Sequence, residues 1–480
     1  MHRFARIALL ASLFALVLPL SALAADRMPV GFQDDPTFRW NGDIETELDK
    51  AQAANASIIR ATADWRAIAA KRPAQPANSF DPAYNLNDLD DLVRNAQKRG
   101  MEVLITIWGT PKWANGGKSP NYLPKKLADL NKFAHALADR YSGRHAGYPY
   151  VGRFSVWNEP NLGLFLMPQF DKKGRVISPK LYAKLYKAAW AGIHAGNKTA
   201  QVAIGETSNL GRDHPKKGAP VSTAPGTFAR LLAQTKGLKF DAYATHPYAT
   251  RQNLPPTQKV RWPNVTLTQL PRFEKSIDQW FHRKNIPIWI TEYGYETKPD
   301  KFGVTFKTQA KWMSSVMRTL RADDRVQLFV WFIFRDSKQS LWQSGLFTEA
   351  GAMKPSYRTF SALAATIDGL TQTVKAGRAP TVSLEVPKLA YSSEPGSIVG
   401  ITYRVFDGRK LIAIGQPTAA LRFDQTVRFV ADFDPVAGRT YSIEMDANDI
   451  NGNHVVRTYN LTAPGKVTAK KKAHKAPKKH

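Results

Sequence analysis

Two glutamates follow apolar segments at comparable positions in this chain. Glu159 stands in VGRFSVWNEPN (151–161), and Glu292 stands in IPIWITEYGYE (286–296). Gly, Asn or Pro would be enough to end such a segment, so a glutamate at the end of each of the two segments needs another explanation. Cleavage of a glycosidic bond needs two opposed carboxyl groups, one to protonate the leaving oxygen and one to attack or orient at the anomeric carbon. The pair predicts sugar chemistry, provided that the fold brings the two groups together.

The segments that carry these glutamates belong to a repeating pattern. From residue 28 to about 370, eight strand-like segments alternate with eight helix-like segments. Several of the strand-like segments are nearly continuous hydrophobic runs, which is typical of parallel strands covered on both faces. The alternation predicts an α/β fold, a (β/α)8 TIM barrel, with a doubly wound open sheet as the alternative. In a barrel, the fourth and seventh strands would deliver both glutamates to the face formed by the carboxyl ends of the strands. The strand-like segments are 28–33, 56–62, 101–108, 151–157, 200–206, 239–246, 286–293 and 325–334.

The pattern changes after the last of these helices. Residues 378–463 contain short β-prone segments joined by turn clusters, including the hairpin signal Asp407-Gly408. They predict a small C-terminal all-β domain, an immunoglobulin-like sandwich. The predicted division of the chain is a signal peptide at 1–24, a catalytic barrel at 25–372, the sandwich at 378–463 and a disordered lysine-rich tail at 464–480.

The first residues have the pattern of an export signal. Arg3 and Arg6 precede an apolar run that ends in Ala22-Leu23-Ala24, a small-residue cleavage site. We therefore expect a secreted protein, either extracellular or periplasmic and associated with the cell envelope. No later apolar stretch is long enough for a membrane span. The chain has no cysteine, which excludes disulfides and thiolate chemistry.

The charge of the chain bears on its partners. The formal net charge is +29, and the segment from Lys466 to His480 holds seven lysines and no acid. Such a surface favours anionic partners, which outside a cytoplasm are acidic polysaccharides or the cell envelope. A charge bias that only keeps the protein in solution is the alternative interpretation. No nucleic-acid motif accompanies the charge, and we expect a monomer without a cofactor.

The two glutamate motifs resemble those of a known group of enzymes. WNEPN on the fourth strand and ITEYG on the seventh are similar to the motifs of the clan A glycoside hydrolases. The resemblance implies that Glu159 is the acid/base, that Glu292 is the nucleophile and that the reaction retains the anomeric configuration. FSVWNEPN is nearest to glycoside hydrolase family 39, in which a Glu usually stands at the position of Ser155. The cellulase-like family 5 is the competitor, and it usually carries a His at the position of Trp108.

Four polar residues are expected to support the pair. The Asn158 amide can hydrogen-bond a sugar hydroxyl next to the reacting carbon. Arg60 ends the second strand, where the resemblance implies contact with the nucleophile; a surface salt bridge is the alternative. His246 and Tyr248, from ATHPY at the end of the sixth strand, are placed to line the sugar site and to hydrogen-bond Glu292. A purely structural histidine is the alternative for His246.

Aromatic residues at the strand ends could hold the sugar ring. Trp331 on the eighth strand, with Trp108 and Trp113 near the end of the third, offer flat apolar faces for a pyranose. No metal site is predicted, because His246 has no second histidine at ligand spacing. A carbohydrate is thus the expected substrate. The other hypothesis is a catalytically silent polysaccharide-binding or cell-surface protein on the same scaffold.

Overall fold

The structure is a computed structural model, and part of the chain falls outside its description. The predicted signal peptide and the lysine-rich tail from residue 466 onward lie outside the described residues. The described residues are 28–338, 342–367, 371–385, 398–408, 410–416, 426–449 and 454–465.

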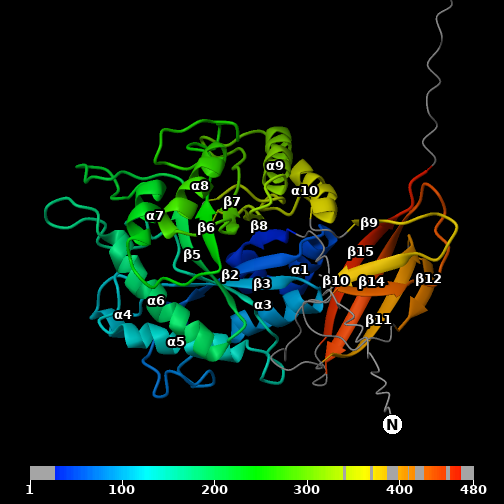
Figure 1. The fold of residues 1–480 in the computed structure, drawn as a ribbon, viewed down its shortest axis with the longest axis horizontal. Helices are drawn as coiled ribbons and strands as arrows, with labels where there is room; N and C mark the ends of the chain where they lie inside the picture. The colour runs from blue at the N-terminus through cyan, green and yellow to red at the C-terminus, as the bar shows by residue number, and fades with distance from the viewer. Residues whose placement is uncertain are drawn as a thin grey trace, which may run out of the picture.

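Eight parallel strands form a closed barrel in sequence order (Figure 1). β1 pairs in parallel with both β2 and β8, so the sheet has no free edge. This closure confirms the predicted (β/α)8 barrel and rules out the open sheet. The strands are β1 (Val30–Gln33), β2 (Ile58–Asp64), β3 (Glu102–Trp108), β4 (Arg153–Val156), β5 (Gln201–Ser208), β6 (Ala242–His246), β7 (Ile288–Tyr293) and β8 (Val326–Phe332).

Helices surround the barrel, and some of them begin at a side-chain cap. The Asp43 side chain accepts the Thr46 N–H at the start of α1, and Thr305 accepts the Thr308 N–H at the start of α9. The helices are α1 (Ile44–Ala53), α2 (Trp65–Ile68), α3 (Asn87–Lys98), α4 (Lys112–Asn115), α5 (Leu127–Arg140), α6 (Ser178–Gly196), α7 (Pro225–Ala233), α8 (Leu270–Phe281), α9 (Phe306–Arg321) and α10 (Pro355–Ile367), with a π-helix η1 (Pro36–Trp40) and a 3-10 helix η2 (Leu267–Gln269).

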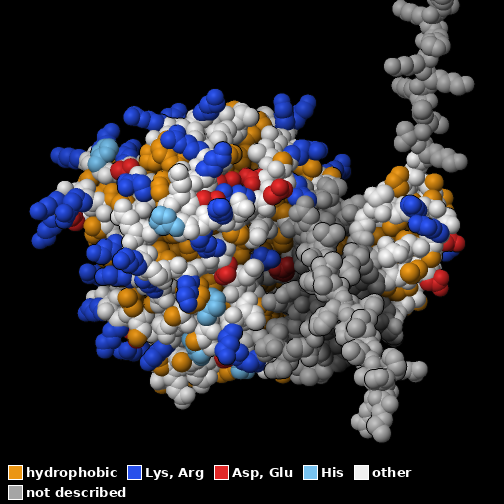
Figure 2. All heavy atoms as spheres, viewed as in Figure 1, with side chains coloured by type: hydrophobic (Ala, Val, Ile, Leu, Met, Phe, Trp, Pro, Cys, Tyr) orange, Lys and Arg blue, Asp and Glu red, His pale blue; other side chains and the backbone are white. Residues whose placement is uncertain are grey.

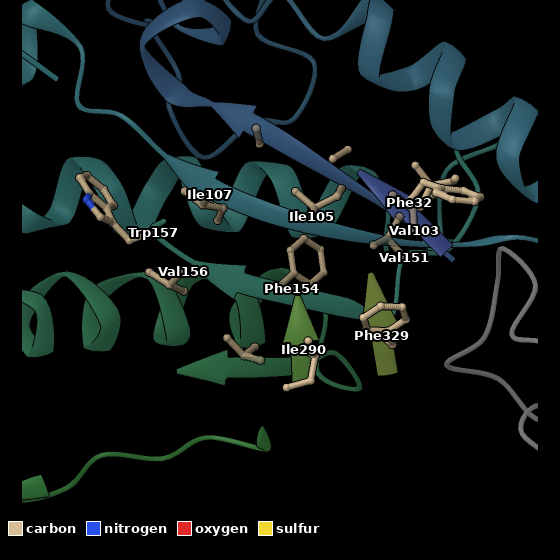
Figure 3. Packing of buried hydrophobic residues seen from close by; sticks show 14 of the residues in the cluster. Phe32, Val103, Ile105, Ile107, Val151, Phe154, Val156, Trp157, Ile290 and Phe329 are labelled. Atoms are coloured by element: carbon tan, nitrogen blue, oxygen red, sulfur yellow. The ribbon is translucent and has the colours of Figure 1, made fainter. Parts of the chain in front are cut away.

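Side chains alternate between the two faces of the barrel wall. Apolar residues such as Ile105, Ile107, Phe154 and Val156 are fully buried in the large cluster that joins the wall to the helices (Figure 3). The alternate positions face the barrel interior, where a smaller apolar cluster fills the lower part. That cluster is Ile58, Leu104, Ala203, Ala242, Ala244, Trp289, Leu328 and Val330. Two residues further along several strands, the same inward face carries the polar side chains Arg60, Thr106, Ser155, His246 and Thr291.

The C-terminal part is all-β, as predicted. β9 to β15 form a five-stranded sheet in the order β12-β11-β14-β15-β9 and a two-stranded sheet of β10 and β13. Their buried core is apolar. The immunoglobulin-like arrangement remains a prediction, because segments that would connect these strands lie outside the described residues. The strands are β9 (Thr371–Thr373), β10 (Thr381–Glu385), β11 (Ile398–Asp407), β12 (Lys410–Gly415), β13 (Thr426–Val430), β14 (Thr440–Asp449) and β15 (His454–Thr462).

Among the described helices, none combines the length and the apolar character that crossing a bilayer requires.

Candidate active site

The backbone after β4 is held in an uncommon conformation. Trp157 and Glu159 have φ angles of 72° and 37°, in the left-handed region that costs a non-glycine residue about 1–3 kcal/mol. Packing maintains it: the Trp157 indole N–H donates to the Phe165 carbonyl at 2.6 Å, and the Tyr182 hydroxyl donates to the Val156 carbonyl at 2.9 Å. The turn thereby places the Glu159 carboxylate in the cavity at the carboxyl ends of the strands.

Glu292 reaches the same cavity from β7. The pairing of β7 with β8 shifts register between Ile290 and Tyr293, and Glu292 lies in this irregular stretch. Its Oε1 accepts the Tyr248 hydroxyl at 3.0 Å, and its Oε2 accepts an Arg60 N–H at 3.2 Å. Only 12% of the Glu292 side chain is exposed, so these donors replace most of its hydration.

His246 joins the two carboxylates. Its Nδ1 lies 3.0 Å from Glu159 Oε1 and 3.5 Å from Glu292 Oε2. The two oxygens therefore cannot be farther apart than the sum of these two distances. The strands place the predicted pair on one side of one imidazole ring.

Arg60 is fully buried beneath the pair, not on the surface. Besides Glu292, its guanidinium donates to Asn158 Oδ1 at 3.0 Å and to Thr106 Oγ1 at 2.9 Å, and it also contacts Gln33 Oε1. Asn158 thus has its carbonyl oxygen fixed, while the residue lines the cavity. The arginine sets the position of both polar groups that flank the reacting site.

A third glutamate, which sequence reasoning missed, completes the cluster. Glu206 has no exposed surface, and its Oε2 lies 2.9 Å from His246 Nε2, 3.2 Å from Arg60 Nη2 and 2.8 Å from the Thr291 hydroxyl. It occupies a bulge in β5, where the pairing with β6 shifts register, and its φ is 50°. The signal was present in the sequence, because the fifth strand-like segment also ends on a glutamate.

The charges in this cluster set its titration. Burial alone would lower the pKa of His246, but Glu292, Glu159 and Glu206 outweigh it and raise the pKa to about 9. Burial would raise the pKa of Glu206, but Arg60 and His246 lower it to about 2. The pKa of Glu292 is raised, because burial and the neighbouring Glu159 outweigh its cationic partners. At neutral pH, His246 is therefore a cation among carboxylates.

The cavity above these groups measures about 470 Å³ and has aromatic walls. Trp108 lies on one side, with its ring in edge contact with Phe165 at 5.8 Å. On the other side is Trp342, whose ring lies 6.2 Å from that of Tyr248. A pyranose has flat apolar faces that suit such rings.

Trp331 does not contribute to this wall. It is fully buried on the outward face of β8, and its indole N–H donates to the Ser344 carbonyl at 2.8 Å. The inward neighbour Phe332 lines the cavity in its place, because successive side chains of a strand point to opposite faces. Trp113 is also absent from the cavity lining, and its indole N–H donates to the Ala69 carbonyl at 2.7 Å.

The chemistry available to the cavity follows from these groups. Within the described residues, no set of three or more His, Cys, Asp or Glu side chains is placed to hold a metal ion. Two carboxyl groups, each slightly exposed and held by fixed donors, face a sugar-sized cavity with aromatic walls. A closed (β/α)8 barrel that presents this arrangement at the carboxyl ends of its strands has the groups that a glycosidase needs.

Comparison with known proteins agrees with this class. The family model described as cellulase (glycosyl hydrolase family 5) matches residues 23–335, and the chain belongs to this family. The clan predicted from the two motifs is confirmed, and the family is the one that the sequence had suggested as the competitor of family 39.

Two solved structures share the fold. A family 39 glycoside hydrolase from Bacteroides cellulosilyticus WH2 is 16% identical, with 92% of this chain and 80% of that chain covered and a TM-score of 0.53. A glucosidase from Croceicoccus marinus is 12% identical, with 91% and 97% covered and a TM-score of 0.53. No curated protein sequence matches the chain.

Proposed function

We propose that this protein is a secreted retaining glycosidase that cleaves β-linked bonds in an oligo- or polysaccharide by double displacement. Glu159 protonates the leaving oxygen, Glu292 attacks the anomeric carbon, and Glu159 then activates the water that releases the sugar. The observation that carries the proposal is the shared contact of both carboxylates with His246 Nδ1.

The spacing of the carboxylates supports retention. Retaining enzymes hold their carboxyl groups about 5 to 5.5 Å apart, and inverting enzymes about 6.5 to 9.5 Å apart. The two distances to His246 Nδ1 limit the separation of the contacting oxygens to the lower edge of the inverting range. The contacting oxygens are therefore no farther apart than the shortest separation found in inverting enzymes, which favours the retaining arrangement.

A substrate screen tests the proposal. We expect the purified protein to release reducing ends from at least one β-linked polysaccharide or to hydrolyse a β-linked aryl glycoside. The matched control is the double variant Glu159→Gln, Glu292→Gln, which should bind the same polymer without cleaving it. Binding by both proteins with no turnover by either would favour the catalytically silent polysaccharide-binding protein.

The basic ends of the chain suggest how the enzyme meets its substrate. The leader at 1–24 would export the protein, and the seven lysines beyond residue 465 would hold it near an anionic polysaccharide or the cell envelope. Removing residues 466–480 should weaken retention on an acidic polysaccharide at low salt and leave turnover of a small glycoside unchanged. Equal retention of the full and shortened chains would contradict this role.

A further inference from the structure

Glu206 makes no contact with the cavity, yet its placement is costly. It is absent from the cavity lining and fully buried, and its backbone is in the left-handed region. The preceding Gly205 has a φ of 104°, and a Cβ there would lie 2.6 Å from the Tyr243 ring. Only glycine fits that position, so the bulge that turns Glu206 inward is built into the sequence.

Glu206 Oε2 contacts groups that hold the carboxylate pair, and the Ser155 side chain also hydrogen-bonds Glu206. Its Oε2 contacts His246 Nε2, Arg60 Nη2 and the Thr291 hydroxyl. The opposite nitrogen of His246 faces Glu159 and Glu292. A carboxylate on Nε2 keeps a proton there, and a second proton on Nδ1 can then be donated toward the cavity.

We propose that Glu206 is a positioning residue that keeps His246 doubly protonated, so that its Nδ1–H donates to whichever of Glu159 and Glu292 carries the negative charge. This inference rests on the proposed retaining mechanism. The retaining mechanism requires Glu292 to be anionic in the free enzyme. When Glu292 bonds to the anomeric carbon, the proton of Glu159 passes to the leaving oxygen and the charge moves to Glu159. His246 stabilises both states without gaining or losing a proton.

The test measures His246 itself. We expect the His246 imidazole in the wild-type protein, followed by ¹⁵N NMR, to titrate near its pKa of about 9. In Glu206→Gln the midpoint should fall by roughly one to three pH units, since an opposite charge has been removed. The matched control Thr291→Val removes a hydrogen bond but no charge and should leave the midpoint nearly unchanged.

Kinetics give a second readout. At pH values between the two His246 midpoints, kcat/KM for an aryl glycoside should fall further in Glu206→Gln than in Thr291→Val, because only the first variant has lost the imidazolium charge. A folded Glu206→Gln variant with an unchanged His246 midpoint would overturn the inference. A wild-type His246 that is neutral at pH 7 would also overturn it, and this measurement does not depend on the folding of the variant. Because the titration needs no substrate, its result is separate from a failure of the proposed function.

A second, independent feature is a groove on the outside of the barrel between α6 and α7. It measures about 470 Å³, and its lining includes three lysines and no acidic residue. Lys180, Lys184 and Lys187 are exposed and follow one face of α6 at helical spacing. The lining residues are Val176, Pro179, Lys180, Ala183, Lys184, Lys187, Leu231, Gln234 and Thr235.

The region around the groove is strongly basic. Residues 171–241 contain thirteen Lys and Arg against four acids, of which Asp171 pairs with Arg175 and Asp241 accepts the Val202 N–H. Glu206 is buried with Arg60, and Asp213 accepts the Ala224 N–H and the Thr227 hydroxyl at the start of α7. Figure 2 shows that Lys and Arg side chains outnumber acidic ones over the face where Figure 1 places α6 and α7.

The geometry points to a binding site for one chain of an anionic polysaccharide, a polyuronate, with its carboxylates on the three lysines and its ring faces on the apolar floor. A concave groove suits a chain better than a flat membrane. The segment between β4 and α6 contributes to both cavities, because Leu164 and Phe165 line the one at the reaction site and Val176 lines the groove. The groove would thus present the acidic polymer that the proposed enzyme cleaves.

The test compares charge reversals at matched sites. We expect Lys180→Glu, Lys184→Glu, Lys187→Glu to raise the Kd for polygalacturonate severalfold at low salt and to flatten its salt dependence. The control triple variant makes the same charge change at other exposed positions and should raise this Kd less; it carries Lys275→Glu, Lys284→Glu and Lys311→Glu. Turnover of a small soluble glycoside should be unchanged in both.

Three outcomes would contradict the proposed binding site. The two triple variants could weaken polygalacturonate binding equally, or the wild-type protein could bind polygalacturonate and a neutral β-glucan with equal affinity. The third is a wild-type protein that binds anionic vesicles but not polygalacturonate. All are measured by binding and do not depend on catalysis.

Discussion

The two ends of the barrel both combine a cavity with buried charge, yet they differ in what surrounds that charge. The cavity at the starts of β7 and β8 is the larger, about 640 Å³ against about 470 Å³ at the carboxyl ends. Its lining contains no aromatic residue, whereas Trp108, Phe165 and Trp342 line the smaller one. Size alone therefore does not locate the site; aromatic walls, converging carboxylates and backbone strain do.

The buried glutamates at the two ends make the same point. Glu274, near the starts of β7 and β8, has its pKa raised to about 8 by burial and by Asp323, while Arg325 stays 3.9 Å away. Glu206 is buried more deeply, but two cations in direct contact lower its pKa to about 2. The acid at the first end is largely neutral at pH 7, whereas the other end holds a cluster of buried paired charges of the kind that concentrates at functional sites.

The largest expected effect is at Glu292. Glu292→Gln removes the group that bonds to the sugar, so turnover of every substrate should fall below detection, including substrates with good leaving groups. The measurement is kcat/KM on an aryl glycoside and on a polymer. Measurable turnover of activated substrates by this variant would mean that Glu292 is not the nucleophile.

Glu159→Ala should be weaker and selective. Loss of a general acid costs about 10²–10⁴-fold on substrates whose leaving group needs a proton, and less on activated aryl glycosides. Added azide should restore part of the rate and give a glycosyl azide of retained configuration. If azide rescues the Glu292 variant instead, the two roles are exchanged.

The aromatic walls should show a smaller effect on binding. Trp342→Ala should raise KM severalfold to tenfold, because a ring contact contributes about 0.5–1.5 kcal/mol. Trp331→Phe is the matched change on the outward face and should lower the Tm while KM stays the same. If Trp331→Phe raised KM and Trp342→Ala did not, Trp331 and not Trp342 would line the sugar site.

A change at the opposite end of the barrel, near the starts of β7 and β8, should affect stability and not turnover. The Glu274 carboxyl is neutral in the folded chain up to a pKa of about 8, against 4.5 ordinarily, so wild type loses stability as pH rises through this window. Glu274→Gln removes that loss. Its Tm relative to wild type should therefore increase from pH 5 to pH 8, with unchanged kcat. A difference in Tm that is equal at both pH values would show that Glu274 titrates normally.

Much of the fold was predictable because it depends on periodicity. Hydrophobic runs alternating with amphipathic segments predicted all eight barrel strands, and the strand-end rule found Glu159 and Glu292. The same rule applied to Glu206, but a mechanism that needs two carboxylates gave no reason to look for a third. Its inward direction depends on a bulge and a positive φ, which periodicity does not show.

The aromatic wall was harder to predict. Trp331 and Phe332 are neighbours, and only the register of β8 decides which of them faces the cavity. Trp342 comes from the segment after the strand, where an isolated bridge with Ser337 brings it back over the site. Such a return depends on tertiary packing and leaves no periodic signal in the sequence.

Product stereochemistry tests the central claim most directly. With an aryl β-glycoside that the wild-type enzyme hydrolyses, ¹H NMR in the first minutes should show the β-anomer of the sugar before mutarotation produces the α-anomer. Retention follows if Glu292 bonds to the sugar and Glu159 acts on both sides of that step. Initial release of the α-anomer would contradict the account, because a single displacement by water needs no nucleophile at the position of Glu292.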